Sequence, residues 1–398
     1  MSSKAINHLL ERNVSEVIVK TDLKKQLEDK KKLKVYLGVD PSGPTIHLGH
    51  AVVLRKLKEF QDLGHEIILL IGDFTAQIGD PTGNSKTRVP LSKAEIAKNF
   101  HDYQAQATKI IAFDGDNPAQ IRFNSSWLGK LTFEDLIKYA ACFTVQQMLE
   151  RDMFEKRIKE EKPIGLHEFF YPLMQGYDSV ALEADVEIGG TDQTFNMLCG
   201  RTLRQKLDSQ DKQVLTVPLL LGTDGRKMSK SFHNDIGINE SPKEQFGKIM
   251  SMKDELIIDY FKLCTNLNVD EIKLINKSLE KGENPRNIKA RLGLEIVTLY
   301  HGEEAAKKAS EEFDQIFKDK KKPSQIPVLD LTAQPVPVVD LVASADSTAS
   351  RGEIKRLCKQ GGIKINNQKE IDFQKKITPK TGMILQIGKR KFFEIKIK

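Results

Sequence analysis

The sequence is poor in cysteine, in tryptophan and in long apolar runs. It contains 4 cysteines, which form no C-x-x-C pair, and 1 tryptophan. Neither a disulfide framework nor a structural zinc site is therefore favoured. The longest apolar run, Ile67 to Ile71, is too short to cross a bilayer, and the N-terminal segment lacks the apolar core of a signal peptide. We expect a cytoplasmic protein that does not bind a membrane.

The length and overall composition indicate a globular protein of several domains. At 398 residues the chain is too long for one typical core. Apolar residues make up 39% of it and charged residues 29%, a balance typical of soluble proteins. No repeat of fixed period is evident, which disfavours a solenoid.

The positive charge is concentrated at the C-terminal end. The chain carries a net charge of +7, and the segment from Arg351 to Lys398 holds 14 Lys and Arg against 4 Asp and Glu. This segment is therefore +10, and everything before it is −3. A local basic excess is typical of a protein that binds nucleic acid. A lysine-rich solubilising surface is the alternative.

The basic segment has the pattern of a folded domain. Ile354, Leu357 and Cys358 have helical spacing, Gly361 and Gly362 end this helix, and IKIN and FFEIKIK are typical of strands. Over residues 337–398 the chain resembles the S4 family of small RNA-binding domains, an α+β fold. The RNA-binding residues that we expect on the helix are Arg351, Lys355, Arg356 and Lys359.

Two changes of pattern divide the rest of the chain. A Pro-rich connector at 323–336 separates the basic domain from what precedes it. Ser241 to Glu244 form a capping box with proline at the first helical position, and helical segments continue to about Lys318. We expect an all-helical domain over 237–322.

The first 236 residues alternate strand and helix. The segments 35–39, 67–72, 110–113 and 214–217 are short apolar runs that predict strands. An amphipathic helix runs through Val52 and Phe60, and Ser92 with Glu95 predicts the cap of another. This alternation predicts an α/β domain with a parallel sheet, whose ligands lie beyond the carboxyl ends of the strands.

The stretch DPSGPTIHLGHAVVL, residues 40–54, places two histidines at the start of a helix. His47 and His50 follow the first predicted strand, where free backbone N–H groups and the helix dipole favour a phosphate. Gly49 lets a flat adenine approach the backbone closely. Both histidines can donate hydrogen bonds to a phosphoryl group whose charge grows in a transition state. A metal half-site and plain core packing are the alternatives.

A second stretch, GTDGRKMSKS at 222–231, carries Lys227 and Lys230 just after the late strand. A cationic loop in this position is suited to closing over a triphosphate, because pyrophosphate leaves with its charge spread over several oxygens. A solvated turn is the alternative. HLGH followed by KMSKS resembles the two signatures of the class I aminoacyl-tRNA synthetases.

The resemblance extends to the tyrosyl-tRNA synthetase family. It is carried by YLGVDPSGPTIHLGH, IGDFTAQIGDPTG, YPLMQGYDSVALEADVEIGGTDQ and KMSKS. It implies a Rossmann-like catalytic domain over 1–236, a helical anticodon-binding domain over 237–322 and an S4-like domain over 337–398. It also implies a homodimer joined through an insertion at 127–168, whose apolar residues include Leu136, Ile137, Phe143, Val145 and Met148.

The resemblance also implies roles for single residues. Tyr36 and Asp178 would bind the phenol hydroxyl of a tyrosine substrate, and Tyr171, Gln175 and Asp80 its ammonium group. Each of these could instead be a core aromatic, a helix cap or a turn residue. The expected catalytic residues are His47, His50, Lys227, Lys230, Lys86 and Arg88; the expected tyrosine-binding residues are Tyr36, Asp80, Tyr171, Gln175, Asp178 and Gln193; the expected ATP- and adenylate-binding residues are Asp40, Gly38, Gly49, Gly190, Asp192, Met228 and Ser229.

Two positions depart from the pattern of some family members. Asn84 stands where others carry a lysine, although Lys86 and Arg88 lie nearby, and Glu187 stands where others have glutamine. These departures affect the expected details of pyrophosphate and ribose binding and leave the reaction class unchanged.

The expected function is that of a tyrosine–tRNA ligase. L-tyrosine and Mg-ATP would form tyrosyl-adenylate, and the tyrosyl group would pass to tRNA(Tyr). No permanently bound cofactor and no metal site on the protein are expected, because ATP carries the Mg²⁺ as a substrate. Two alternatives are a tryptophan ligase of the same fold and an RNA-binding processing or regulatory protein on a synthetase scaffold. Tyr36 with Asp178 argues against the first, and the intact signatures argue against the second.

Overall fold

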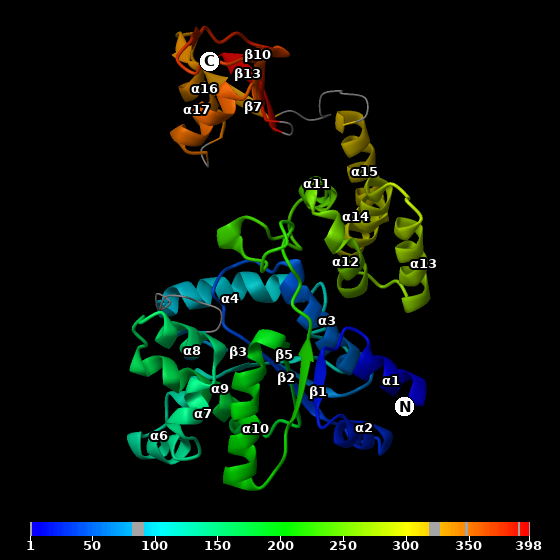
Figure 1. The fold of residues 1–398 in the computed structure, drawn as a ribbon, viewed down its shortest axis with the longest axis vertical. Coiled ribbons are helices and arrows are strands. Elements are labelled where there is room, and N and C mark those ends of the chain that lie inside the picture. The colour runs from blue at the N-terminus through cyan, green and yellow to red at the C-terminus, as the bar shows by residue number, and fades with distance from the viewer. Residues whose placement is uncertain (1, 82–90, 318–326, 347–348, 389–390, 398) are drawn as a thin grey trace. The chain divides into compact units, whose positions relative to one another are not determined.

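The computed structural model describes residues 2–81, 91–317, 327–346, 349–388 and 391–397 (Figure 1). The chain divides into two compact units, Met1–Ala306 and Lys307–Lys398. Within the described residues, no helix is both long enough and apolar enough to cross a membrane.

A six-stranded sheet lies at the centre of the first unit, in the order β1-β6-β5-β2-β3-β4. Its neighbouring strands are parallel, except that β1 runs antiparallel to β6. The predicted α/β fold with a parallel sheet is confirmed, and the antiparallel edge strand was not foreseen. The strands are β1 (Glu16–Ile18), β2 (Lys34–Val39), β3 (Glu66–Ile71), β4 (Gln120–Phe123), β5 (Val186–Gly190) and β6 (Gln213–Val217).

Helices cover both faces of this sheet, because alternate side chains of a strand point to opposite faces. Val35 and Leu37 of β2 belong to the large core that includes residues of α1, α3 and α4, whereas Tyr36 lies in a smaller cluster on the other face. On that second face α9 and α10 lie side by side (Figure 1). These helices are α1 (Ser3–Glu11), α2 (Lys20–Glu28), α3 (Leu48–Asp62), α4 (Lys93–Ala107), α9 (Phe170–Ala181) and α10 (Thr194–Asp208).

The prediction of a strand at 110–113 is wrong. The amides of Ile110 and Ile111 both bond to the Ala107 carbonyl at 2.9 Å, so these residues form a turn directly after α4. The run is apolar because Ile111 is buried in the core. Periodicity alone cannot distinguish such a buried turn from a buried strand. The strand comes later, as β4, which lies at the sheet edge and carries the mixed sequence QIRF.

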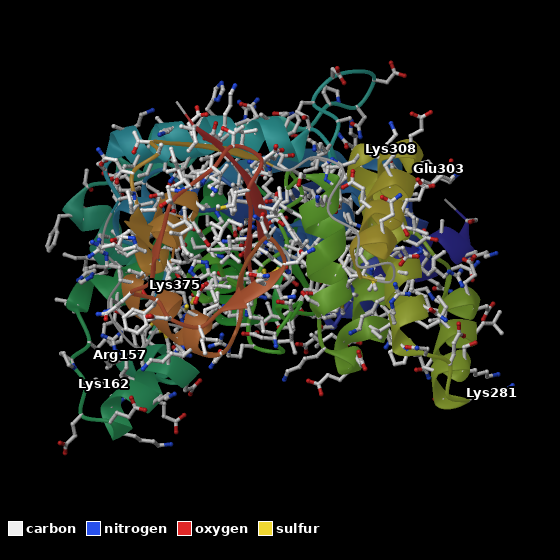
Figure 2. All side chains as sticks on the ribbon, turned by 90° about the horizontal axis from the view of Figure 1, so that it is seen from above. Arg157, Lys162, Lys281, Glu303, Lys308 and Lys375 are labelled. Atoms are coloured by element: carbon white, nitrogen blue, oxygen red, sulfur yellow. The ribbon has the colours of Figure 1, made fainter. Side chains whose placement is uncertain are left out.

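Short helices fill the segment between β4 and α9. An ion pair fixes this segment: the guanidinium of Arg157, labelled in Figure 2, lies 2.6 Å from the Glu168 carboxylate, and both side chains are 3% exposed. The helices are α5 (Ser125–Leu128), α6 (Phe133–Ala140), α7 (Val145–Leu149) and α8 (Asp152–Lys159).

The helices after the sheet continue its core. Ser241 and Glu244 form the predicted capping box of α11, with Pro242 in the first turn. Ile249 and Ile296 belong to the same core as Val35. The helices are α11 (Pro242–Ser251), α12 (Ile257–Cys264), α13 (Val269–Glu280), α14 (Pro285–His301) and α15 (Glu303–Phe317), of which α15 spans the division between the two units.

The second unit has its own core and its own sheet. Ile354 and Cys358 of α17 pack with Ile363, Leu385 and Ile395. A five-stranded sheet has the order β10-β9-β12-β13-β7, and β8 pairs with β11. Residues 328–331, within the expected connector, form β7 beside β13. The elements are β7 (Val328–Leu331), β8 (Val336–Pro337), α16 (Val338–Ala345), α17 (Arg351–Lys359), β9 (Ile363–Ile365), β10 (Gln368–Glu370), β11 (Lys376–Ile377), β12 (Ile384–Ile387) and β13 (Lys391–Ile397).

Candidate active site

A cavity of about 720 Å³ lies beyond the carboxyl ends of β2 and β5. Its wall combines the start of α3, one side of α9 and the segment 227–232. Lys86 and Arg88, like Asn84, lie outside the described residues. The predicted residues that line the cavity are Gly38, Asp40, His47, Gly49, His50, Asp80, Tyr171, Gln175, Asp178, Gly190, Asp192, Gln193, Lys227, Met228, Ser229 and Lys230.

The two histidines cap α3 reciprocally. The amide of His50 donates to Nδ1 of His47 and the amide of His47 donates to Nδ1 of His50, each at 3.4 Å. The rings stack with their centroids 3.7 Å apart. Because Nδ1 accepts a hydrogen bond in both residues, the neutral rings carry their protons on Nε2. Each histidine therefore has an N–H group available to a ligand in the cavity.

Both histidines are neutral at pH 7. Burial lowers the pKa of His47 to about 4, although the Asp235 carboxylate opposes the shift. Burial also lowers the pKa of His50 well below its ordinary value, with His47 and Lys230 acting in the same direction. The pair therefore offers hydrogen-bond donors without a positive charge. Among the described residues, no group of three or more His, Cys, Asp and Glu is placed to hold a metal ion.

The segment that carries Lys227 and Lys230 lies against the start of α3. The Leu48 amide bonds to the Ile236 carbonyl at 2.9 Å. A Cβ atom added to Gly43 would lie 2.8 Å from Nζ of Lys230, which places that amine beside the turn before α3. Burial lowers the pKa of Lys230, and Asp235 opposes this shift. The two signature stretches therefore meet at one end of the cavity.

A buried asparagine holds this segment in place. The side chain of Asn234 is 2% exposed. Its Nδ2 donates to Asp224 Oδ1 at 2.8 Å and to the Lys227 carbonyl at 3.1 Å, and its Oδ1 accepts from the Ser229 amide at 2.8 Å. Lys227 itself pairs with Asp192 at 2.7 Å across the cavity wall. The sequence reasoning missed Asn234, because its bonds reach back over the loop and follow no motif.

A group of carboxylates lines the middle of the cavity. Asp40 accepts from the Tyr171 hydroxyl at 2.8 Å and from the Thr75 hydroxyl at 2.7 Å. A Cβ atom at Gly72 would lie 2.0 Å from Asp40 Oδ1, so only glycine leaves room for this carboxylate. Burial raises the pKa of Tyr171 well above its ordinary value, and Asp40 adds to this shift. Tyr171 therefore keeps its proton and donates a hydrogen bond to Asp40.

Asp80 is held from two sides. Gln193 Nε2 donates to its Oδ2 at 2.8 Å, and Arg151 Nη2 lies 3.2 Å from its Oδ1. Arg151 comes from the segment between β4 and α9 and is 5% exposed. Sequence reasoning did not find Arg151, since nothing in its neighbourhood resembles a site. The Asp80 carboxylate gives this region of the cavity an acceptor for a cationic group.

Asp178 lies at the buried end of the cavity, on α9. Trp127 Nε1 donates to its Oδ1 at 2.7 Å, and Asn124 Nδ2 donates to its Oδ2 at 3.2 Å. Burial raises the pKa of Asp178 well above its ordinary value, and the two donors oppose this shift. With N–H donors already on both oxygens, Asp178 is arranged as an acceptor for a further O–H group.

Tyr36 lies near Asp178, but Tyr36 is not among the described residues that line the cavity. Tyr36 is fully buried, and its hydroxyl lies 2.7 Å from Ser179 Oγ. Burial raises the pKa of this hydroxyl well above its ordinary value, with Glu187 and Asp178 adding to the shift. Tyr36 therefore contacts Ser179, the residue next to Asp178 on α9, at the buried end of the cavity.

The predicted RNA-binding residues lie on α17 of the second unit. A hollow of about 410 Å³ is lined by Lys355, Arg356, Lys359 and Phe373, among others. The amines of Lys355 and Lys359 lie 5.3 and 5.9 Å from the centre of the Phe373 ring. Arg351 pairs instead with Asp340 at 2.8 Å. The helix therefore presents a cluster of cations beside an aromatic ring.

Comparison with known proteins identifies the family. Residues 27–318 match the family described as tRNA synthetases class I (W and Y). The chain is 47% identical over 389 residues to the tyrosine–tRNA ligase of Thermotoga maritima, with 97% of this chain and 96% of that protein covered. It is 44% identical over 389 residues to the tyrosine–tRNA ligase of Haemophilus influenzae, with 98% of this chain and 96% of that protein covered.

Solved structures of distant relatives share the fold. The chain is similar to a C-terminally truncated mitochondrial tyrosyl-tRNA synthetase of Aspergillus nidulans, with a TM-score of 0.64 at 24% identity, over 79% of this chain and 94% of that one. It is also similar to the tyrosyl-tRNA synthetase of Archaeoglobus fulgidus complexed with L-tyrosine, with a TM-score of 0.62 at 24% identity, over 77% of this chain and 99% of that one. The signatures, the fold and nearly full-length relatives agree, and the chain belongs to the tyrosine–tRNA ligases, a family of class I tRNA synthetases.

Proposed function

We propose that this chain activates L-tyrosine with Mg-ATP and transfers the tyrosyl group to tRNA(Tyr). In the first step a carboxylate oxygen of tyrosine attacks the α-phosphorus of ATP, the bond to pyrophosphate breaks, and tyrosyl-adenylate forms. In the second step the 3′-terminal ribose hydroxyl of the tRNA attacks the tyrosyl carbonyl, and AMP leaves. The observation that carries this proposal is that both signature stretches and the acceptor Asp178 line one cavity.

His47 and His50 would act on the phosphate end through their Nε2–H groups. Charge on the phosphoryl oxygens grows in the transition state, and fixed neutral donors at a helix N-terminus stabilise that charge without reorganisation. Lys227 and Lys230 would supply the positive charge for the departing pyrophosphate. Lys86 and Arg88 are proposed as further cations for the same group. Catalysis then rests on positioning and electrostatics and needs no side-chain nucleophile.

The remaining lining would divide between the two substrates. Asp178, backed by Tyr36, would accept the phenol O–H of tyrosine, so phenylalanine would leave a buried acceptor unpaired. Asp80, Tyr171 and Gln175 would hold the ammonium group, and Gln193 the carboxylate. The residues proposed for ATP and the adenylate are Asp40, Gly38, Gly49, Gly190, Asp192, Met228 and Ser229.

We assign tRNA binding to the helical segment 237–322 and to the basic domain 337–398, joined by the connector 323–336. The proposed RNA contacts are Arg351, Lys355, Arg356 and Lys359, whose charges attract phosphates without reading sequence. Phe373 beside them gives a flat apolar surface on which a base can stack. We place this reaction in the cytoplasm, where the chain would meet its tRNA.

We also propose that the chain forms a homodimer through the insertion 127–168. Three large apolar side chains of this segment are exposed: Phe133 at 77%, Val145 at 69% and Ile137 at 56%. Met148, in contrast, is buried within the chain itself. Replacing Ile137 and Val145 by aspartate should yield monomers in analytical ultracentrifugation, whereas an unchanged dimer would contradict this interface.

Tyrosine-dependent exchange of pyrophosphate with ATP tests the proposed function. Purified protein should exchange labelled pyrophosphate into ATP when tyrosine is present, and far less when tryptophan or phenylalanine replaces it. Exchange that prefers tryptophan would identify the sister ligase. Absence of exchange with every amino acid, from protein that still binds RNA, would support an RNA-binding protein on a synthetase scaffold.

A further inference from the structure

A buried ion pair joins Glu187, which lines the cavity, to Lys212, which lies behind it. Lys212, which precedes β6, is 0% exposed, and Glu187 of β5 is 1% exposed. The amine of Lys212 donates to the Glu187 carboxylate, to Ser179 Oγ at 2.8 Å and to the Met197 carbonyl at 2.9 Å. A buried pair of this kind is costly to desolvate and is retained only where its geometry is fully satisfied.

The pair is connected to both ends of the proposed tyrosine site. On one side Glu187 Oε1 accepts from Gln175 Nε2 at 3.1 Å, and Gln175 lines the cavity. On the other side Ser179, which accepts from Lys212, lies 2.7 Å from the Tyr36 hydroxyl. A single ammonium group therefore fixes residues near the ammonium end and near the hydroxyl end of the site.

We propose that Lys212 is a positioning residue for tyrosine, acting through Glu187 on Gln175 and through Ser179 on Tyr36. This inference rests on the proposed function, because it assumes that tyrosine occupies the cavity. Lys212 does not belong to the described cavity lining and is not expected to touch a substrate.

The chemistry of each partner explains why charged residues serve here. An ionised carboxylate only accepts hydrogen bonds, so Gln175 must turn its NH₂ group toward Glu187 and its carbonyl oxygen away from it. That oxygen is then available to accept from the ammonium group of tyrosine. A glutamine at 187 would impose no such orientation, because its amide both donates and accepts. The buried Lys212 ammonium lies beside this carboxylate as its opposite charge.

The surrounding packing leaves room for this amine. A Cβ atom at Gly200 of α10 would lie 2.5 Å from Nζ of Lys212 and 2.4 Å from Ser179 Oγ. Any larger residue at this position would displace the amine from its three acceptors. Burial lowers the pKa of Lys212, and Glu187 is the main group that opposes the shift. Removing either charge therefore leaves the other one buried and unpaired.

The test compares K212M, the double variant K212M/E187Q and the control K56M. Lys56 is also a buried lysine, bonded to the Leu9 carbonyl at 3.0 Å and paired with Glu59, and neither partner lines the cavity. For each protein, pyrophosphate exchange gives KM for tyrosine, KM for ATP and kcat, and thermal unfolding gives Tm.

K212M should lower kcat/KM for tyrosine by about 10²-fold, the usual cost of a misplaced binding group, with KM for ATP changed by less than about 3-fold. The double variant should recover Tm over K212M, because removing the stranded carboxylate restores charge balance, but it should not recover kcat/KM for tyrosine, because a glutamine at 187 does not orient Gln175. K56M should lower Tm and leave the kinetic constants for both tyrosine and ATP at their wild-type values. Equal effects on both substrates in K212M, or the same tyrosine loss in K56M, would overturn the proposal.

Should K212M fail to fold, S179A decides the question without changing any charge. Losing the link from Lys212 to Tyr36 should lower kcat/KM for tyrosine by about 10-fold, the equivalent of one hydrogen bond, while KM for ATP stays unchanged. A value within about 2-fold of the wild type would overturn the proposal. Wild-type protein without tyrosine-dependent exchange would refute the proposed function and this inference together, whereas wild-type exchange without the substrate split would refute the inference alone.

Discussion

Replacing Asn234 by alanine should slow the formation of tyrosyl-adenylate and leave tyrosine binding unchanged. Asn234 makes three hydrogen bonds, to Asp224, to the Lys227 carbonyl and from the Ser229 amide, at 2.8 to 3.1 Å. At about 1 kcal/mol for each bond, the ordered loop loses about 3 kcal/mol. Since about 1.4 kcal/mol corresponds to a tenfold change in rate, the step should slow by about 10²-fold.

The sole tryptophan provides the assay for binding. Trp127 donates to Asp178 at the buried end of the cavity, so its fluorescence should change when tyrosine binds there. Titration with tyrosine gives Kd, and single-turnover formation of adenylate at saturating ATP gives the rate. In the N234A variant Kd should match the wild type, because the loop acts on the phosphate end of the cavity.

N268A is the matched control. Asn268 caps α13, and its Oδ1 accepts from the amides of Asp270 and Glu271 at 3.0 and 2.9 Å, away from the described cavity lining. Loss of this cap should cost about 1 kcal/mol of stability and leave the adenylate rate unchanged. A wild-type rate in N234A, or a loss of tyrosine affinity as large as the loss of rate, would refute the proposal that Asn234 orders the loop for adenylate formation.

Three further predictions concern the tyrosine site, the basic domain and the histidine pair. D178A should lower the ratio of kcat/KM for tyrosine over phenylalanine by at least about 10-fold, and an unchanged ratio in folded protein would argue for a structural carboxylate. K355A/K359A should weaken tRNA charging, reduce the salt slope of tRNA binding by about 2 and spare pyrophosphate exchange; an unchanged slope would mean that these lysines only solubilise the domain. The lowered pKa of His47, about 4 in the folded chain, should make stability fall as pH drops from about 6.5, since the unfolded chain binds the proton first. H47N should make this dependence less steep in urea unfolding between pH 7 and about 4, with part of it kept by the lowered pKa of His50, and an equal slope in both proteins would show that His47 does not contribute to it.

The sequence predicted those parts of the fold that local patterns determine. Apolar strands, capping boxes and glycine stops depend on neighbours a few residues apart, so β2, β3, the Ser92 cap of α4 and the end of α17 near Gly361 were predicted from the chain alone. The prediction of a strand at 110–113 was wrong because it, too, relied on a local pattern alone. A run of four apolar residues indicates burial, and burial does not distinguish a strand from the turn that follows a helix.

The site was predictable where motifs carry it and unpredictable where single distant residues complete it. The histidines and lysines of the two signatures line one cavity, as expected from the sheet topology. Asn234, Arg151 and Lys212 act through partners that are close in space and follow no spacing rule. Lys212, for instance, lies 25 residues from Glu187 and 33 from Ser179 in the chain. Glu187, a departure from the family pattern, is explained only once its buried partner is known.

The requirements of helix capping alone do not explain a pair of histidines at the start of α3. A serine with a glutamate three residues later satisfies the same two amides, as Ser92 and Glu95 do at α4. At α3 a glutamate would bring a negative charge beneath the position proposed for the phosphates. The stacked imidazoles satisfy the two amides through Nδ1, remain uncharged and keep Nε2–H available to the cavity. The choice of histidine is therefore a choice of chemistry at a position where helix stability had simpler solutions.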